Sequence, residues 1–308
     1  MDEPINRRQL LGCSAAALTA AVVSGVECPA QTTSTAEGGV KRGCLPPRRF
    51  KLGLVTYDLA RNWDLPTIIQ RCQELRFEAV ELRTGQKHGV EPDISKTQRQ
   101  EVRKRFADSS LVLWGLGTTC QYHEPDPAAV ARNIEATKRF IELAHDLGAR
   151  GVKVRPNGLP KEVSPAKTIE QIGRSLRICG QAAASMGVEL WVEVHGSGTS
   201  LPATMRKIMD LTDHPNVGVT WNSNYPSDLV SGSLGTGFRL LADKIKSVHI
   251  NELTCGYPYQ ELFDLLRSRG YDRYTLMEIQ PLASPDPQDT LRFAGYYAAL
   301  WDALSQAR

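Results

Sequence analysis

Residues 148–195 decide the fold, and they read GARGVKVRPNGLPKEVSPAKTIEQIGRSLRICGQAAASMGVELWVEVH. An apolar run at Gly151–Arg155 is followed by a segment of helical period that begins at Ser164-Pro165 and stops at Gly187. A second apolar run follows directly at Val188–His195. A short buried strand, a helix and another short buried strand, in that order, are typical of a parallel sheet with helical crossovers.

The same alternation continues outward in both directions, from residue 51 to the C-terminus. Apolar runs that end at polar residues predict eight strands, at Lys51–Tyr57, Glu78–Arg83, Leu111–Thr118, Gly151–Arg155, Val188–His195, Val217–Asn222, Lys246–Asn251 and Tyr274–Ile279. A segment of helical period follows each run. Asp64 and Asp126-Pro127 are suited to begin two of these helices, and Gly148 is suited to end one.

Eight strand–helix units between residues 51 and 308 match a closed (β/α)8 barrel, which folds as a single domain of about 250 residues. An open doubly wound sheet is the alternative. It normally carries a glycine-rich phosphate loop after the first strand, and Val55-Thr56-Tyr57-Asp58-Leu59 has no glycine. We therefore predict an α/β fold with one (β/α)8 TIM barrel over residues 50–308.

Composition narrows the classes of function. The 37 Lys and Arg against 34 Asp and Glu leave a formal charge of +3, which provides no concentrated basic field for nucleic acid. The seven cysteines form no CxxC pair, which argues against a cysteine-rich zinc site. Hydrophobic residues make up 41% of the chain, enough for a large core. The sequence leaves homo-oligomerisation open.

The N-terminal segment has the pattern of a secretory signal. Arg7 and Arg8 precede an apolar, alanine-rich stretch at Cys13–Val26, and the arginine pair favours the twin-arginine route. We predict a signal peptide at residues 1–30 and a polar linker at 31–49. A disordered basic start before a buried helix is one alternative. A lipoprotein cleavage site at Cys13 is another, but it leaves no room for an apolar core.

This pattern predicts an exported protein in the periplasm or another extracytoplasmic compartment. The apolar stretch is too short and weakly hydrophobic for a membrane span, so no stable membrane insertion is expected after processing. The twin-arginine route carries folded proteins, so export is compatible with a metal loaded in the cytoplasm.

Polar residues end the predicted strands, and in a TIM barrel the chemistry lies at the strands' C-terminal ends. Glu193, Asn222, His249 and Glu278 come from four successive strands and should converge on one mouth. Two carboxylates, an amide oxygen and an imidazole suit one divalent ion such as Mn²⁺, Mg²⁺, Co²⁺ or Zn²⁺.

Three motifs in chain order carry a family resemblance. Val192-Glu193-Val194-His195-Gly196, Val248-His249-Ile250-Asn251-Glu252 and Leu276-Met277-Glu278 resemble strands five, seven and eight of the xylose isomerase-like sugar isomerase/epimerase family. The resemblance implies one divalent ion held by Glu193, Asn222, His249 and Glu278. The family usually has Asp where this chain has Asn222, which removes a negative charge, and often has Asp where this chain has Glu252.

The resemblance also implies the chemistry. In the epimerase branch two metal-bound glutamates transfer the proton next to a carbonyl, which assigns Glu193 and Glu278 as the acid/base pair of a carbohydrate isomerase or epimerase. Glu252 keeps a carboxylate near His249 that can orient the ring. The substrate is expected to be a free or oxidised carbohydrate. Its binding residues are expected to be Arg83, His88, Lys153, Arg155, His195, Asn224 and Glu252.

Alternative functions use the same barrel. The same enediolate leads to elimination in a keto-glycoside lyase, and the sequence does not choose between isomerisation, epimerisation and elimination. A non-catalytic carbohydrate-binding barrel would treat Asn222 as the mark of a lost metal site. A metal-dependent apurinic-site nuclease needs many histidines at strand ends, and only His195 and His249 qualify.

Overall fold

The computed structural model describes residues 46–283 and 286–306. The predicted signal at 1–30 and most of the linker lie outside these residues. Eight strands alternate with eight helices in the described part. The strands are β1 (Lys51–Val55), β2 (Ala79–Arg83), β3 (Val112–Gln121), β4 (Gly151–Arg155), β5 (Glu189–Glu193), β6 (Val217–Trp221), β7 (Ile245–Ile250) and β8 (Tyr274–Met277).

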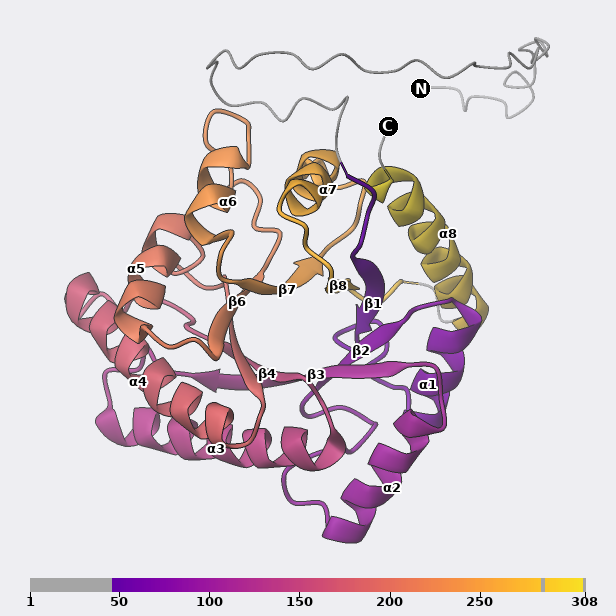
Figure 1. The fold of residues 1–308 in the computed structure, drawn as a ribbon, viewed down its shortest axis with the longest axis horizontal. Coiled ribbons are helices and arrows are strands. Elements are labelled where there is room, and N and C mark those ends of the chain that lie inside the picture. The colour runs from indigo at the N-terminus through magenta and orange to yellow at the C-terminus, as the bar shows by residue number, and fades with distance from the viewer. Residues whose placement is uncertain (1–45, 284–285, 307–308) are drawn as a thin grey trace, which may run out of the picture. The chain divides into compact units, whose positions relative to one another are not determined.

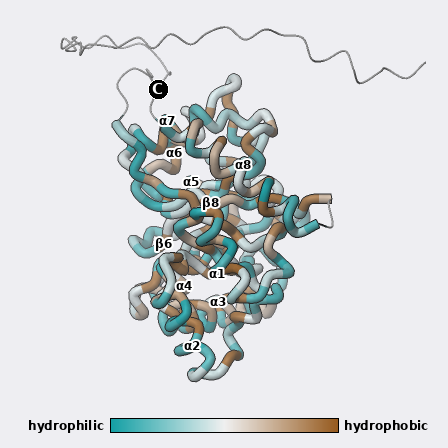
Figure 2. The backbone as a smooth tube through the Cα atoms, turned by 90° about the vertical axis from the view of Figure 1, so that its right-hand side faces the viewer, coloured by the Kyte–Doolittle hydropathy of each residue, from teal (hydrophilic) through white to brown (hydrophobic). Residues whose placement is uncertain are grey.

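The helices follow the strands and surround the barrel (Figure 1). They are α1 (Leu65–Glu74), α2 (Lys96–Ala107), α3 (Pro127–Leu147), α4 (Pro165–Ser185), α5 (Pro202–Thr212), α6 (Gly235–Leu241), α7 (Tyr259–Ser268) and α8 (Pro287–Ser305). Hydrophobic and hydrophilic residues alternate along them (Figure 2), as expected for helices that bury one face. Among the helices described, none has the length and apolar character of a membrane span.

The strands form one closed parallel barrel in chain order, which confirms the predicted fold. Closure is made by β1 and β8, where Leu52 pairs with Thr275 and Leu54 with Met277. This pairing excludes the doubly wound alternative, because an open sheet has two unpaired edges. The predicted helix signals also hold: Asp64 accepts a hydrogen bond from the Thr67 N–H at 3.0 Å, and Gly148 ends α3 in the left-handed region with φ 76°.

The lower half of the barrel, at the N-terminal ends of the strands, is filled by aromatic side chains. Trp191 stacks on Trp114 with ring centroids 4.9 Å apart. A Cβ at Gly115 would lie 2.7 Å from the Trp191 ring, and one at Gly151 would lie 2.4 Å from it. The two glycines therefore make room for a tryptophan in a close-packed lumen. This packing closes the lower end of the lumen and leaves the opposite end open to a ligand.

Candidate active site at the barrel mouth

A cavity of about 300 Å³ lies at the C-terminal ends of the strands. Its walls come from residues at or just beyond the C-terminal ends of seven strands, all except β3: Tyr57, Arg83, Lys153, Arg155, Glu193, His195, Asn222, Ser223, Asn224, Asn251, Glu278, Ile279 and Gln280. This volume is at the small end of the range for ligand pockets, which suits one small polar molecule.

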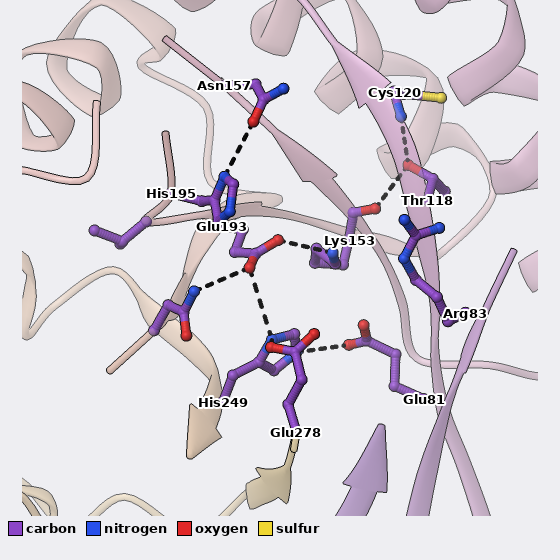
Figure 3. A network of polar contacts seen from close by, with 12 residues as sticks. Glu81, Arg83, Thr118, Cys120, Lys153, Asn157, Glu193, His195, His249 and Glu278 are labelled. Atoms are coloured by element: carbon purple, nitrogen blue, oxygen red, sulfur yellow. Dashed lines mark hydrogen bonds and ion pairs between the residues drawn. The ribbon is translucent and has the colours of Figure 1, made fainter. Parts of the chain in front are cut away.

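Three carboxylates surround one buried imidazole beneath this cavity (Figure 3). His249 Nδ1 lies 3.0 Å from Glu278 Oε2 and 4.0 Å from Glu193 Oε1, and its Nε2 lies 3.3 Å from Glu81 Oε2. His249 and Glu81 are fully buried. Burial disfavours the imidazolium, but the charges of Glu278 and Glu81 outweigh that effect and raise the pKa of His249 to about 10.

The donor set fits a divalent cation. Glu193, His249 and Glu278 each offer one ligand atom, and these three atoms lie within 4.8 Å of one another. Two carboxylate oxygens and one imidazole nitrogen are ligands that Mn²⁺, Mg²⁺, Co²⁺ and Zn²⁺ accept. With Nδ1 on an ion, Nε2–H faces Glu81, which is the carboxylate–histidine arrangement that orients metal-binding imidazoles.

Lys153 neutralises part of this negative charge. Its Nζ donates to Glu193 Oε2 at 2.7 Å, and both side chains are almost completely buried. Burial alone would raise the pKa of Glu193, but Lys153, His249 and His195 together lower it below the usual range. Glu193 is therefore held as a carboxylate, with Oε1 left for other partners.

Asn222 follows β6 directly and reaches Glu193 through its amide nitrogen. Nδ2 donates to Glu193 Oε1 at 3.1 Å, while Oδ1 accepts from the backbone N–H of Ser223 at 2.9 Å. In this arrangement the amide oxygen is occupied by the backbone. Asn222 would have to turn its amide to ligate an ion through oxygen.

Two arginines line the side of the cavity formed by β2 and β4. Arg83 lies over the ring of Tyr57, with the guanidinium carbon 5.5 Å from the ring centroid, and Nη1 donates to the Thr84 carbonyl at 3.3 Å. Arg155 buries its Nε atom without a hydrogen-bond partner among the described residues. Burial lowers the pKa of Arg155 from its ordinary value; the charge of Glu193 opposes this effect, and the charge of Arg83 adds to it.

His195 is fixed by a chain of amides. Asn157 Nδ2 donates to Gln121 Oε1 at 2.5 Å, so Asn157 Oδ1 is turned toward His195 Nδ1 at 3.0 Å. A carbonyl oxygen only accepts, so Nδ1 carries the hydrogen and Nε2 is the acceptor of the neutral ring. Asn224 also borders the cavity and donates through Nδ2 to the Val194 carbonyl at 2.7 Å.

Residues 69–293 match the model of a family described as xylose isomerase-like TIM barrel. The chain belongs to this family. The match covers most of the barrel, and it agrees with the position of the carboxylate and imidazole side chains at the mouth. No curated protein is significantly similar to the chain in sequence.

Solved structures of the same fold include carbohydrate epimerases. A D-psicose 3-epimerase from Clostridium cellulolyticum H10 has 17% identity and a TM-score of 0.71, with 83% of this chain and 100% of that chain covered. A 3-keto-D-glucoside 4-epimerase from E. coli has 16% identity and a TM-score of 0.66, with 82% and 99% covered. The IolI protein, solved with a bound zinc atom, has 15% identity and a TM-score of 0.61, with 84% and 99% covered. At these identities the likeness shows the fold.

Most residues predicted for the site of this xylose isomerase-like chain do line the cavity or lie directly beneath it. Those bordering the cavity are Arg83, Lys153, Arg155, Glu193, His195, Asn222, Asn224 and Glu278, and His249 lies beneath them. The structure brings them together from β2, β4, β5, β6, β7 and β8.

His88 is placed differently from the prediction. Its side chain is buried, and the Val90 N–H donates to Nδ1 at 3.0 Å, which leaves Nε2–H to donate to the Arg83 carbonyl at 2.8 Å. Burial also lowers the pKa of His88. Both ring nitrogens are occupied by backbone groups, so His88 supports the loop after β2, and it does not border the cavity.

Glu252 is also corrected. It is exposed, and it lines a separate hollow with Leu253 and the α8 residues Phe293 and Tyr297. The β7 strand ends at Ile250, so the chain has already turned outward at Glu252. The carboxylates that orient His249 are Glu81 and Glu278 instead.

The sequence-based set missed Glu81 and Asn251. Glu81 stands two positions before Arg83 on β2, so both side chains face the same side of the strand, and that spacing was the available signal. Asn251 borders the cavity and donates through Nδ2 to the Ser223 carbonyl at 3.1 Å. It stands two positions after His249, which is the same spacing.

Proposed function

We propose that the protein is a divalent-metal-dependent carbohydrate isomerase or epimerase that moves a proton on the carbon next to a carbonyl. One observation carries this proposal: Glu193, His249 and Glu278 bring their ligand atoms within 4.8 Å of one another at the mouth of a TIM barrel. The similarity in fold to carbohydrate epimerases agrees with it.

The ion would be held by Glu193, His249 and Glu278, with Asn222 as a fourth ligand if its amide turns. A divalent ion held there would supply Lewis-acid chemistry at a carbonyl oxygen. Glu81 would hold the imidazole in the orientation in which Nδ1 faces the ion. A metal-loaded His249 must be unprotonated, so its raised pKa predicts that binding releases a proton.

Glu193 and Glu278 are the pair that would take the proton from carbon and return one. Both carboxylates border the cavity, and the Glu278 side chain is 15% exposed while that of Glu193 is 4% exposed. The ion pair with Lys153 keeps Glu193 ionised and fixes the carboxylate in place. Such positioned carboxylates contribute about 10²–10⁴-fold to proton transfer.

The experiment is solvent deuterium exchange. The purified protein is stripped with a chelator, reloaded with Mn²⁺ and incubated in D₂O with fructose, psicose, tagatose and a 3-keto-glucoside, and NMR follows the carbon-bound protons. Exchange at the carbon next to the carbonyl with a new configuration supports epimerisation, and transfer of the carbonyl supports isomerisation. Glu278→Gln should abolish exchange, whereas Glu135→Gln on the exposed surface of α3 should retain it.

Two other functions give different results in the same experiment. Release of the aglycone from the keto-glucoside would replace the proposal by a keto-glycoside lyase. Ligand binding without exchange or bond cleavage, together with no bound metal, would replace it by a carbohydrate-binding barrel. Each outcome contradicts the isomerase or epimerase assignment.

Export is a separate proposal, supported by the arginine pair and the apolar stretch that follows it. We propose that residues 1–30 are a twin-arginine signal and that the barrel works outside the cytoplasm. Replacing Arg7 and Arg8 by Lys should leave the precursor in the cytoplasm, as measured by cell fractionation. Unchanged export of the double variant would contradict this route.

A further inference from the structure

We propose that the substrate carries a carboxylate, and that Arg83 and Arg155 hold it at the side of the cavity formed by β2 and β4. The ligand class is thus a carbohydrate acid and not a neutral sugar. This inference deepens the proposed function, since it concerns the same cavity, but it depends on binding and not on turnover.

The two guanidinium groups are the unpaired charges of the mouth. Lys153 is paired with Glu193, and His249 lies between Glu81 and Glu278. Within the part of the chain that the structure describes, no carboxylate oxygen lies within 4.0 Å of a guanidinium nitrogen of Arg83 or Arg155.

Two cations therefore lie in one cavity, and no carboxylate of the described residues forms an ion pair with either, although the charges of Glu193 and Glu278 act on Arg155 from a distance. Arg83 makes one long hydrogen bond, to the Thr84 carbonyl at 3.3 Å, and Arg155 buries Nε with no partner. A buried polar atom without a partner is costly, and such groups call for an explanation. A ligand that accepts from both guanidinium groups would satisfy them.

The strands place both arginines on one wall. Arg83 ends β2 and Arg155 ends β4, so the two come from the strands on either side of β3. Opposite Arg83, β3 carries Gly117, and a Cβ there would lie 2.6 Å from Glu81 Oε1 and 3.4 Å from Arg83 Cδ. The glycine leaves the space over β3 that the Arg83 side chain occupies.

The chemistry of guanidinium favours a carboxylate as the partner. Arginine offers a planar fork of N–H donors that matches the two oxygens of a carboxylate, and these charge-assisted bonds are about twice as strong as neutral ones. A neutral hydroxyl would leave both guanidinium groups without an anion in direct contact, in a partly buried cavity where the charge of Arg83 also disfavours that of Arg155. A phosphate dianion would bring a second negative charge toward Glu193 and Glu278 on the opposite wall.

Isothermal titration of the full-length, metal-loaded protein tests this with three matched probes: D-glucuronate, D-glucose and D-glucose 6-phosphate. Glucuronate should bind at least about 10-fold more tightly than glucose, as expected for one or two charged hydrogen bonds. Arg83→Met and Arg155→Met should each remove most of that preference. Arg132→Met, on the exposed surface of α3, is the matched control and should keep it.

Three results would overturn the inference: equal affinities for glucuronate and glucose, tightest binding of glucose 6-phosphate, or an unchanged preference in both methionine variants. If a methionine variant fails to fold by circular dichroism, the Arg→Lys variant at the same position takes its place. Lysine keeps the positive charge but lacks the paired N–H donors of the guanidinium group, so the preference for glucuronate over glucose should become smaller without vanishing.

The failure of this inference is distinguishable from failure of the proposed function. Deuterium exchange on neutral keto-sugars together with equal binding of glucose and glucuronate would sustain the enzyme and reject the carbohydrate acid. An arginine-dependent preference for glucuronate without exchange on any probe would sustain the ligand class and leave the enzyme unsupported.

Discussion

Strand β5 begins and ends with a buried glutamate, and the two glutamates have opposite surroundings. Glu189, at the bottom of the barrel, contacts three cations: Arg273 at 2.7 Å, Arg150 at 2.8 Å and Lys246 at 3.7 Å. The Trp191 Nε1–H also donates to it at 2.9 Å. Burial would raise the pKa of Glu189, but these partners outweigh burial and lower it to about 2.

Glu193, at the mouth, has one lysine and faces other carboxylates. Lys153 holds its Oε2, while Oε1 points toward Asn222 and the ring of His249. Three carboxylates thus gather around one histidine, and among the residues that the structure describes no carboxylate forms an ion pair with Arg83 or Arg155. Buried charge therefore has two uses in this barrel. At the bottom each charge has an opposite charge beside it, which stabilises the fold, whereas at the mouth some charged groups have no such partner and can bind a ligand.

The largest expected effect follows from removing the mouth's most exposed carboxylate. Glu278→Gln keeps the side-chain volume but removes a proton acceptor and a negative charge, so exchange or turnover should fall about 10²–10⁴-fold. The variant should still fold, because Glu81 still contacts His249 and Lys153 still holds Glu193, although loss of the contact between Glu278 and His249 should lower the unfolding midpoint. Activity above about a tenth of the original would exclude Glu278 from the chemistry.

Glu189→Gln should lower the stability of the protein and leave its turnover unchanged. It leaves Arg273, Arg150 and Lys246 without their shared anion at the bottom of the barrel, and loss of one partner of a buried ion pair costs about 3 kcal/mol. Urea unfolding should show this loss, while turnover per folded molecule should stay unchanged. A variant as stable as the unchanged protein would show that the cluster contributes nothing, and the contrast with Glu193 would disappear.

The pH dependence of stability should differ between buried acids that contact cations and buried acids that do not. Asp228 is buried beside the mouth, where Tyr257 OH donates to it at 2.7 Å and no cation compensates it among the described ion pairs. Burial raises its pKa from 3.8 to about 6, so the folded protein binds a proton that the unfolded chain has lost. Stability from this group is therefore present below pH 3.8 and is lost as pH rises to about 6.

The loss amounts to about 2–3 kcal/mol at most, from 1.36 kcal/mol per pKa unit. Asp228→Asn should remove this fall when unfolding is measured from pH 4 to pH 7. Glu189 has the opposite sign, because its lowered pKa gives stability that is present above pH 4.5 and is lost toward about 2. If the unfolding free energy of Asp228→Asn falls with pH as it does in the unchanged protein, other groups cause that fall.

The smallest effect concerns Asn222. Asn222→Asp replaces a donor to Glu193 by a carboxylate 3.1 Å away, so the metal-free protein should have a lower Tm. With Mn²⁺ the added charge should tighten binding about 10-fold, because hard cations prefer carboxylate to amide oxygen. Asn222→Leu is the matched control and should weaken binding. Equal Mn²⁺ affinities in all three proteins would remove Asn222 from the metal site.

Much of the fold was predictable because it depends on local patterns. Alternating strand and helix periods predicted all eight units, and Asp64 and Gly148 marked helix ends that the structure confirms. Only β4 has the predicted bounds, and most other strands differ by one or two residues at an end. The largest difference is in β3, which extends to Gln121 because it pairs again with Arg155 after an irregularity, whereas the run of apolar residues ends earlier. Pairing with a neighbouring strand decides that extension, not the composition of the strand itself.

The candidate site was predictable only in outline. Spacing by two along a strand placed Glu193 and His249 on the inward side, and parallel strands bring their ends to one mouth. Whether His249 contacts Glu81, 168 positions earlier in the chain, depends on closure of the barrel. The spacing rule does not extend to His88 and Glu252, because both lie in loops after strands. The path of each loop decides what its side chains reach.

The barrel and the residue types at its mouth could thus be predicted from the order of residues, since hydrophobic period and residue spacing are properties of the chain. Which charges are paired depends on the folded arrangement. Lys153 reaches Glu193 across adjacent strands, Asn222 turns its nitrogen to the same carboxylate, and Arg83 and Arg155 are left without one. Electrostatic interactions depend on distance and burial in space, and neither quantity can be read from the order of residues.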